Sequence, residues 1–179
     1  MRKKLIIIAL LINLAFGAYL LSSNQRLYSK SESDKFGFEV SENSVLQNPP
    51  AGKARIYALR TKEYIGASVS YELYYQYNPT ISVNIKGQSE PLIDKNAYKR
   101  NVVGKFSNES KFFKDFDAGK ALLLLSTLET HSYIVFTPKA GRIYCVKGSI
   151  ILGLNKARPN LEFIGKDECE TLYKKIQSH

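Results

Sequence analysis

Apolar and polar residues alternate along several short stretches of the chain, and the clearest stretch is residues 68–77. There every second residue from Val69 to Tyr77 is apolar or aromatic, and the residues between them are mostly polar. A strand places successive side chains on opposite faces of a sheet, so this pattern predicts a strand with one face toward the core. Further short apolar runs predict strands at residues 54–60, 80–85, 102–106, 111–116, 121–127, 132–137, 142–148, 149–154 and 160–164.

Two short connections carry the residues that tight turns require. Residues 117–120 have the sequence Asp-Ala-Gly-Lys, and residues 138–141 begin with Pro138 and end with Gly141. Because proline presets φ and glycine relieves the chain reversal, the second connection predicts a hairpin between its flanking strands. The polar residues 87–101 predict a long loop.

The last element changes from a period of two to the period of a helix. Residues 167–177 carry an apolar stripe at i, i+3, i+4 and i+7 that starts at Cys169. Asp167 is the expected N-cap, and Glu170 completes a capping box. Short strands followed by one helix predict a mainly β domain, either an antiparallel β-sandwich or a partly open barrel with one C-terminal α-helix.

Residues 1–21 have the pattern of a bacterial export signal. A short cationic stretch precedes an apolar run that begins at Leu5, and Ala15 and Gly17 are the small residues expected before a cleavage site. The apolar run continues to Leu21, which makes 17 residues, or about 26 Å of helix, against a hydrocarbon core of about 30 Å. Two outcomes therefore stay open, cleavage after Gly17 or retention as an inner-membrane anchor. Both export the rest of the chain to the bacterial periplasm or cell envelope.

The next segment, residues 22–53, is polar and serine-rich and has no sustained period. It ends in Asn48-Pro49-Pro50, which favours an extended, non-helical backbone. These features predict a polar linker with a short strand at residues 36–40. The β-rich domain is then expected to cover residues 54–179.

Three segments of the chain carry a resemblance to known domains. Residues 52–60 have the sequence GKARIYALR, residues 103–127 run from VGKFSNES to ALLLLST, and residues 139–164 run from KAGRIYCV to PNLEFI. Together they resemble bacterial envelope domains of unknown function, often carried on lipoproteins, similar in style to PEGA-type and carboxypeptidase-regulatory-like β-sandwiches. The resemblance implies the fold and assigns no functional residue. The chain departs from it by lacking a lipoprotein cysteine near the leader.

The formal charge of the chain is +10, with 26 basic and 16 acidic residues. Three of the positive charges belong to Arg2, Lys3 and Lys4 in the leader, so the rest of the chain carries 23 basic and 16 acidic residues and a charge of +7. Such a balance favours anionic surfaces, but the basic residues are spread along the sequence rather than clustered. We therefore expect no nucleic-acid partner, since a nucleic-acid footprint gathers basic residues on one face.

The sequence offers little for catalysis or metal binding. It has only two histidines, His131 and His179, and no metal-binding, nucleophile-elbow or phosphate-loop motif. Asp115 and Asp117 flank Phe116 ahead of a turn, where aspartate commonly bonds to the backbone, so they are interpreted as turn residues. We expect no enzyme, no cofactor and no metal site.

The two cysteines, Cys145 and Cys169, lie in a predicted strand and on the apolar face of the predicted helix. Outside the cytoplasm an even count favours a disulfide, which would join the helix to the sheet; two buried thiols are the alternative. A loop of this length predicts a stabilisation of about 3.5 kcal/mol.

A group of tyrosines between residues 71 and 77 is the remaining feature. Tyr71, Tyr75 and Tyr77 share the predicted core face, whereas Tyr74 points the other way and is the candidate binding-surface aromatic. We expect a non-enzymatic module that binds an envelope protein or a cell-wall component. The alternative is a small-ligand or lipid-binding β-domain that uses the interior of the sheets.

Overall fold

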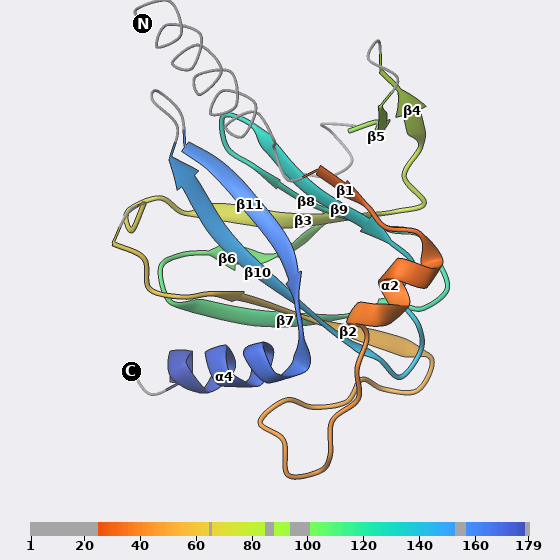
Figure 1. The fold of residues 1–179 in the computed structure, drawn as a ribbon, viewed down its shortest axis with the longest axis vertical. Coiled ribbons are helices and arrows are strands. Elements are labelled where there is room, and N and C mark those ends of the chain that lie inside the picture. The colour runs from red at the N-terminus through yellow and green to blue at the C-terminus, as the bar shows by residue number, and fades with distance from the viewer. Residues whose placement is uncertain (1–24, 65, 85–87, 94–100, 153–156, 178–179) are drawn as a thin grey trace, which may run out of the picture.

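The computed structural model describes residues 25–64, 66–84, 88–93, 101–152 and 157–177, and within them it shows two stacked sheets, a small hairpin and two helices (Figure 1). The predicted signal or anchor at residues 1–21 lies outside the described residues. As the alternation predicted, the chain is mainly β.

Nine of the described strands form the two large sheets. The five-stranded sheet has the order β1 (Gln25–Leu27), β9 (His131–Phe136), β8 (Leu122–Thr127), β3 (Tyr71–Tyr77) and β6 (Val102–Phe106). The four-stranded sheet has the order β11 (Ala157–Ile164), β10 (Ile143–Leu152), β2 (Lys53–Arg60) and β7 (Ser110–Asp117). A separate hairpin consists of β4 (Ile81–Val83) and β5 (Ser89–Pro91).

The main core lies between the two large sheets. Ile56 and Phe116 of the four-stranded sheet and Leu124 and Phe136 of the five-stranded sheet are all buried in it. In β3, Tyr71 and Leu73 are buried and Tyr75 and Tyr77 pack against the same cluster. The predicted core face of this strand is therefore confirmed.

Both sheets are mixed, so the antiparallel arrangement expected for the sandwich is only partly present. β1 runs parallel to β9, and β2 runs parallel to β10. Parallel neighbours need a crossover connection, and between β2 and β10 the chain passes through strands of the opposite sheet. Over the described residues the sheets do not close into a barrel.

The connection at residues 138–141 also differs from its prediction. β9 lies in the five-stranded sheet and β10 in the four-stranded sheet, so this turn carries the chain from one sheet to the other and is not a hairpin. Gly141 takes a positive φ of 76°, which suits glycine in a reversal of either kind. Residues 143–148 and 149–152, predicted as parts of two strands, belong to the single strand β10.

The segment predicted to be a polar linker packs on the domain. It contains β1, the helix α2 (Lys30–Phe36), and a bridge between Phe38 and Ile143. Val40 and Leu46 are buried against the outer face of the four-stranded sheet. The linker prediction is wrong because a few well-spaced apolar residues, rather than a sustained period, hold this segment in place.

The C-terminal helix α4 (Lys166–Gln177) lies where it was predicted, and its predicted apolar stripe faces the sheet. Its Cys169 is buried, and Leu172 and Tyr173 pack on the outer face of the four-stranded sheet. The helix begins at Lys166, one residue earlier than expected, so Asp167 lies inside the first turn and is not the N-cap. The negative charge of Asp167 is still favourable there, because the N-terminus is the positive end of the helix dipole.

Candidate functional site

The strongest candidate for a binding surface is the outer edge of the four-stranded sheet. It is named here the β7 edge and consists of Lys111, Phe113 and Asp115 of β7 with Arg55 and Tyr57 of β2. The alternation of both strands sends their intervening residues toward the main core and leaves these five on the outer face. The helix α4 packs on the same side of the sheet (Figure 1), where its Tyr173 contacts Tyr57 and Lys111.

Cross-strand pairs fix the side chains of the β7 edge. Asp115 lies opposite Arg55 and accepts two hydrogen bonds from it, Nε to Oδ1 at 2.7 Å and Nη2 to Oδ2 at 2.8 Å. Phe113 lies opposite Tyr57, with ring centroids 5.4 Å apart, and the Arg55 guanidinium lies 4.5 Å from the Phe113 ring. The Phe113 ring thus contacts neighbours on β2 although 48 % of the residue is exposed.

The backbone of β7 is open on the side away from β2. The Arg55 amide donates to the Arg142 carbonyl, so the odd-numbered residues of β2 face β10 and the even-numbered ones face β7. The residues of β7 that bond to β2 are then Phe112, Lys114 and Phe116. Among the described residues, no hydrogen bond partner exists for the outward amides of Lys111, Phe113 and Asp115.

The next outward amide, that of Asp117, is occupied. It donates to the hydroxyl of Tyr77 on the opposite sheet, at 2.8 Å. The Asp117 carboxylate also pairs with Lys53 at 2.6 Å and with Lys120 at 3.0 Å. These two ammonium groups lower the pKa of Asp117, and the carboxylate raises the pKa of Lys53. The open part of the edge therefore ends before Asp117.

Lys111, at the other end of the open part, has an unusual environment. Its ammonium nitrogen is shielded from solvent, lies 4.3 Å from the centre of the Tyr173 ring on α4, and has no hydrogen bond partner among the described residues. Burial lowers the pKa of this group. Within the described ranges, the positive charge of Lys111 thus faces the Tyr173 ring and no hydrogen bond acceptor.

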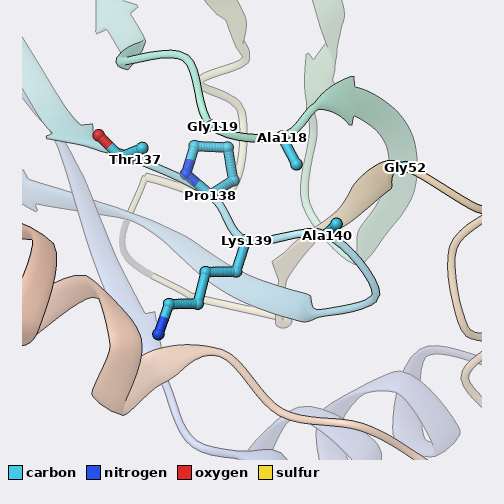
Figure 2. Close-up of a pocket in the computed structure, with 7 residues that line it drawn as sticks. All are labelled: Gly52, Ala118, Gly119, Thr137, Pro138, Lys139 and Ala140. Carbon is cyan, nitrogen blue, oxygen red and sulfur yellow. The ribbon is translucent and has the colours of Figure 1, made fainter.

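A hollow of about 430 Å³ lies at one end of the sandwich, where three connections meet. Its lining consists of Gly52, Ala118, Gly119 and residues 137–140. Figure 2 shows that the Lys139 side chain extends toward α2 and away from the hollow, and its ammonium pairs with Asp34 at 2.5 Å. The lining offers small side chains and no charged group directed inward, so it gives no basis for a chemical role.

A second hollow, of about 510 Å³, is lined by Glu63, Tyr64, Ile150 and Leu152. Tyr64 is 93 % exposed and packs little. Because this lining is mostly apolar and open, it is a weaker candidate than the β7 edge, whose aromatic ring contacts Tyr57 and Arg55.

The residues singled out from the sequence fall in different places. Cys145 and Cys169 form the predicted disulfide, with their Cα atoms 6.1 Å apart. Tyr74 lies on the outer face of the five-stranded sheet, half-buried against Leu125 and Tyr133, with its hydroxyl donating to Glu72. The binding role suggested for Tyr74 stays a prediction.

Of the residues considered for catalysis, His179 lies outside the described residues, and the other three, His131, Asp115 and Asp117, do not form a group. His131 opens β9 and pairs with Thr127 across the β8–β9 turn. Asp115 and Asp117 each pair with a basic residue of β2. In the part of the chain that the structure describes, no three His, Cys, Asp or Glu side chains come together as possible metal ligands.

Comparison with known proteins gives no assignment. No protein-family model matches the chain, and no curated protein or solved structure matches it either. The resemblance to PEGA-type and carboxypeptidase-regulatory-like domains therefore stays a prediction. None of the helices in the described ranges is long and apolar enough to cross a membrane.

Sequence reasoning missed Phe113, although a signal for it exists. Phe112 and Phe113 are adjacent in a predicted strand, and adjacent residues of a strand cannot share a face. One of the two rings must therefore leave the core, and the structure shows that it is Phe113.

Proposed function

We propose that the chain is an exported, non-enzymatic interaction module of the bacterial cell envelope, which binds a protein partner along the β7 edge. The observation that carries this proposal is an open edge strand with a half-exposed phenylalanine at its centre, in contact with Tyr57 and Arg55. The unpaired amides of such a strand can bond to an added strand, and an aromatic ring beside an arginine is a common interface anchor.

The envelope location rests on the leader and on the cysteines. The cationic and apolar residues of segment 1–21 favour export, and a disulfide between Cys145 and Cys169 fits an oxidising compartment such as the periplasm. A basic chain is also suited to work next to anionic lipid.

One observation and one chemical argument favour a protein partner over the other classes of ligand. The residues that suggested an internal ligand site, such as Tyr71 and Leu124, belong to the packed core between the sheets. That packing supports binding at the surface rather than inside the sandwich. A protein also brings the backbone amides that can complete β7, whereas a cell-wall polysaccharide does not.

Photo-crosslinking in intact cells tests the proposal. The photoreactive analogue p-benzoylphenylalanine is placed at Phe113, or at Val83 as a control, since Val83 is 68 % exposed on the β4–β5 hairpin. We expect a discrete adduct from position 113 and none from position 83. Adding Lys111→Pro should abolish the adduct, because proline removes an outward amide that no internal partner uses. Absence of an adduct from position 113, or equal adducts from both positions, contradicts the proposal.

A further inference from the structure

We propose that the partner of the β7 edge is a second copy of this chain, with the two β7 strands paired antiparallel and centred on Phe113. This inference rests on the proposed function of the edge and names its partner. It follows from the order of charged and aromatic residues along β7, from its open amides and from its closed end.

The outward residues of β7 complement themselves when the strand is reversed. Antiparallel pairing about Phe113 places the ring opposite its copy and places Lys111 opposite Asp115 of the partner subunit. Two-fold symmetry makes this contact twice. Opposite charges and aromatic rings are favourable as directly facing cross-strand pairs, so all the outward positions of the open edge gain a suitable neighbour.

Other registers are worse. Only shifts that keep odd-numbered residues facing each other can use the outward amides. A shift toward the end of β7 sets Phe113 opposite a carboxylate and needs the amide of Asp117, which already donates to Tyr77. A shift the other way sets Lys111 opposite Phe113 and leaves Asp115 without a facing cation. The register centred on Phe113 avoids both defects.

The state of Lys111 supports the same pairing. Its ammonium lacks a hydrogen bond partner among the described residues, while Asp115 has carboxylate oxygens that bond only to Arg55. Across the dimer junction Asp115 of the partner subunit adds a carboxylate on the Lys111 side, and Arg55 of that subunit completes a three-charge network. The pairing also covers the exposed part of Phe113.

Self-pairing has a further physical advantage over an open edge. An eight-residue edge strand with an exposed aromatic ring is prone to add strands without limit. A two-fold antiparallel junction consumes both edges at once and closes the assembly at two chains. The four-stranded sheets of the two copies then form one continuous sheet with α4 on the same outer side of each half.

Sedimentation of the purified full-length chain in detergent is the first test. We expect a concentration-dependent dimer, with a dissociation constant raised about tenfold or more by K111E or by D115K alone, because each places like charges face to face twice. An equimolar mixture of K111E and D115K should restore dimers, since each chain then faces opposite charges. A chain that stays monomeric at all concentrations, or a mixture that does not recover, overturns the inference.

A second variant does not depend on charge or on the stability of D115K. Phe113→Cys places a thiol on the two-fold axis, where the Cα separation of a hydrogen-bonded antiparallel pair, about 5.5 Å, suits a disulfide. We expect a covalent dimer of Phe113→Cys under mild oxidation and none of Val83→Cys at the same concentration. Equal yields from both variants overturn the inference.

The cellular photo-crosslinking separates the two proposals. An adduct with the mass of two chains from position 113 supports both. An adduct with a different protein, together with a monomeric purified chain, overturns self-pairing and leaves the proposed function standing. No adduct from position 113 overturns both.

Discussion

Asp117 bonds to residues of both sheets and of a turn. Its carboxylate pairs with Lys53 at the start of β2 and with Lys120 in the turn that follows β7, and its amide bonds to Tyr77 of the opposite sheet. The Asp117 carboxylate is open to solvent, which screens its ion pairs. These pairs therefore affect stability mainly through the lowered pKa of Asp117 and little through burial.

The lowered pKa of Asp117 predicts a dependence of stability on pH. Because the folded pKa lies below the ordinary value of 3.8, the carboxylate stabilises the fold above that value and loses this contribution as the pH falls through the folded pKa. We expect Asp117→Asn to be less stable than the parent chain at pH 7 and to lose less stability between pH 5 and pH 2. Urea unfolding at pH 7 and between pH 5 and pH 2 measures both; parallel plots of stability against pH for the two chains would contradict the prediction.

At the scale of the elements, period and turn chemistry predicted where most strands lie but not how they pair. The predicted bounds agree to within one residue with the observed ones for the strands at residues 102–106 and 121–127 and for the C-terminal helix, because each has a clear local period. Assignment to a sheet is a long-range property, so Pro138 and Gly141 could not distinguish a hairpin from a crossing between sheets. The helix α2 was not predicted, although Ser29 and Glu32 form a capping box at its start.

The candidate site was predictable only in part. The disulfide followed from compartment, count and helix periodicity, all of which are local or global properties of the sequence. The pairing of Arg55 with Asp115 depends on the register between strands 60 residues apart, which no local pattern specifies. The exposed face of Phe113 could be suspected from Phe112 beside it, but its contacts with Tyr57 and Arg55 could not.

The disulfide between Cys145 and Cys169 joins α4 to β10, and its removal predicts a measurable loss. The double variant C145S/C169S should lose about 3.5 kcal/mol of unfolding free energy, because the unfolded chain regains the freedom of the closed loop. Hydrogen exchange should rise first in α4 and later in β2. Reduction of the parent chain gives the matched comparison, and unchanged stability in both cases would contradict the prediction.

At the scale of the whole molecule, residues 25–53 are part of the folded unit and set its N-terminal boundary. The segment adds an edge strand to one sheet and packs Val40 and Leu46 on the outer face of the other. Its Phe36 instead packs against the main core, stacked on Phe163 at 5.0 Å between ring centroids. The domain therefore starts near β1 rather than at residue 54.

Leu46 provides the test of this wider boundary. It is 2 % exposed, so Leu46→Ala should cost about 2–5 kcal/mol of unfolding free energy through lost burial and a cavity. Glu42→Ala, at an exposed position of the same segment, should change stability by less than about 0.5 kcal/mol. Equal and negligible effects of the two substitutions would show that the segment is a loose tail in solution.

The early start of β1 has a consequence for where the protein can act. Only three residues separate Leu21 from Gln25, and a fully extended chain covers at most about 14 Å over that interval. If the leader is retained, the domain has almost no reach and stays against the bilayer. Any partner must then come to the membrane surface, and two copies would meet by lateral diffusion in the same membrane.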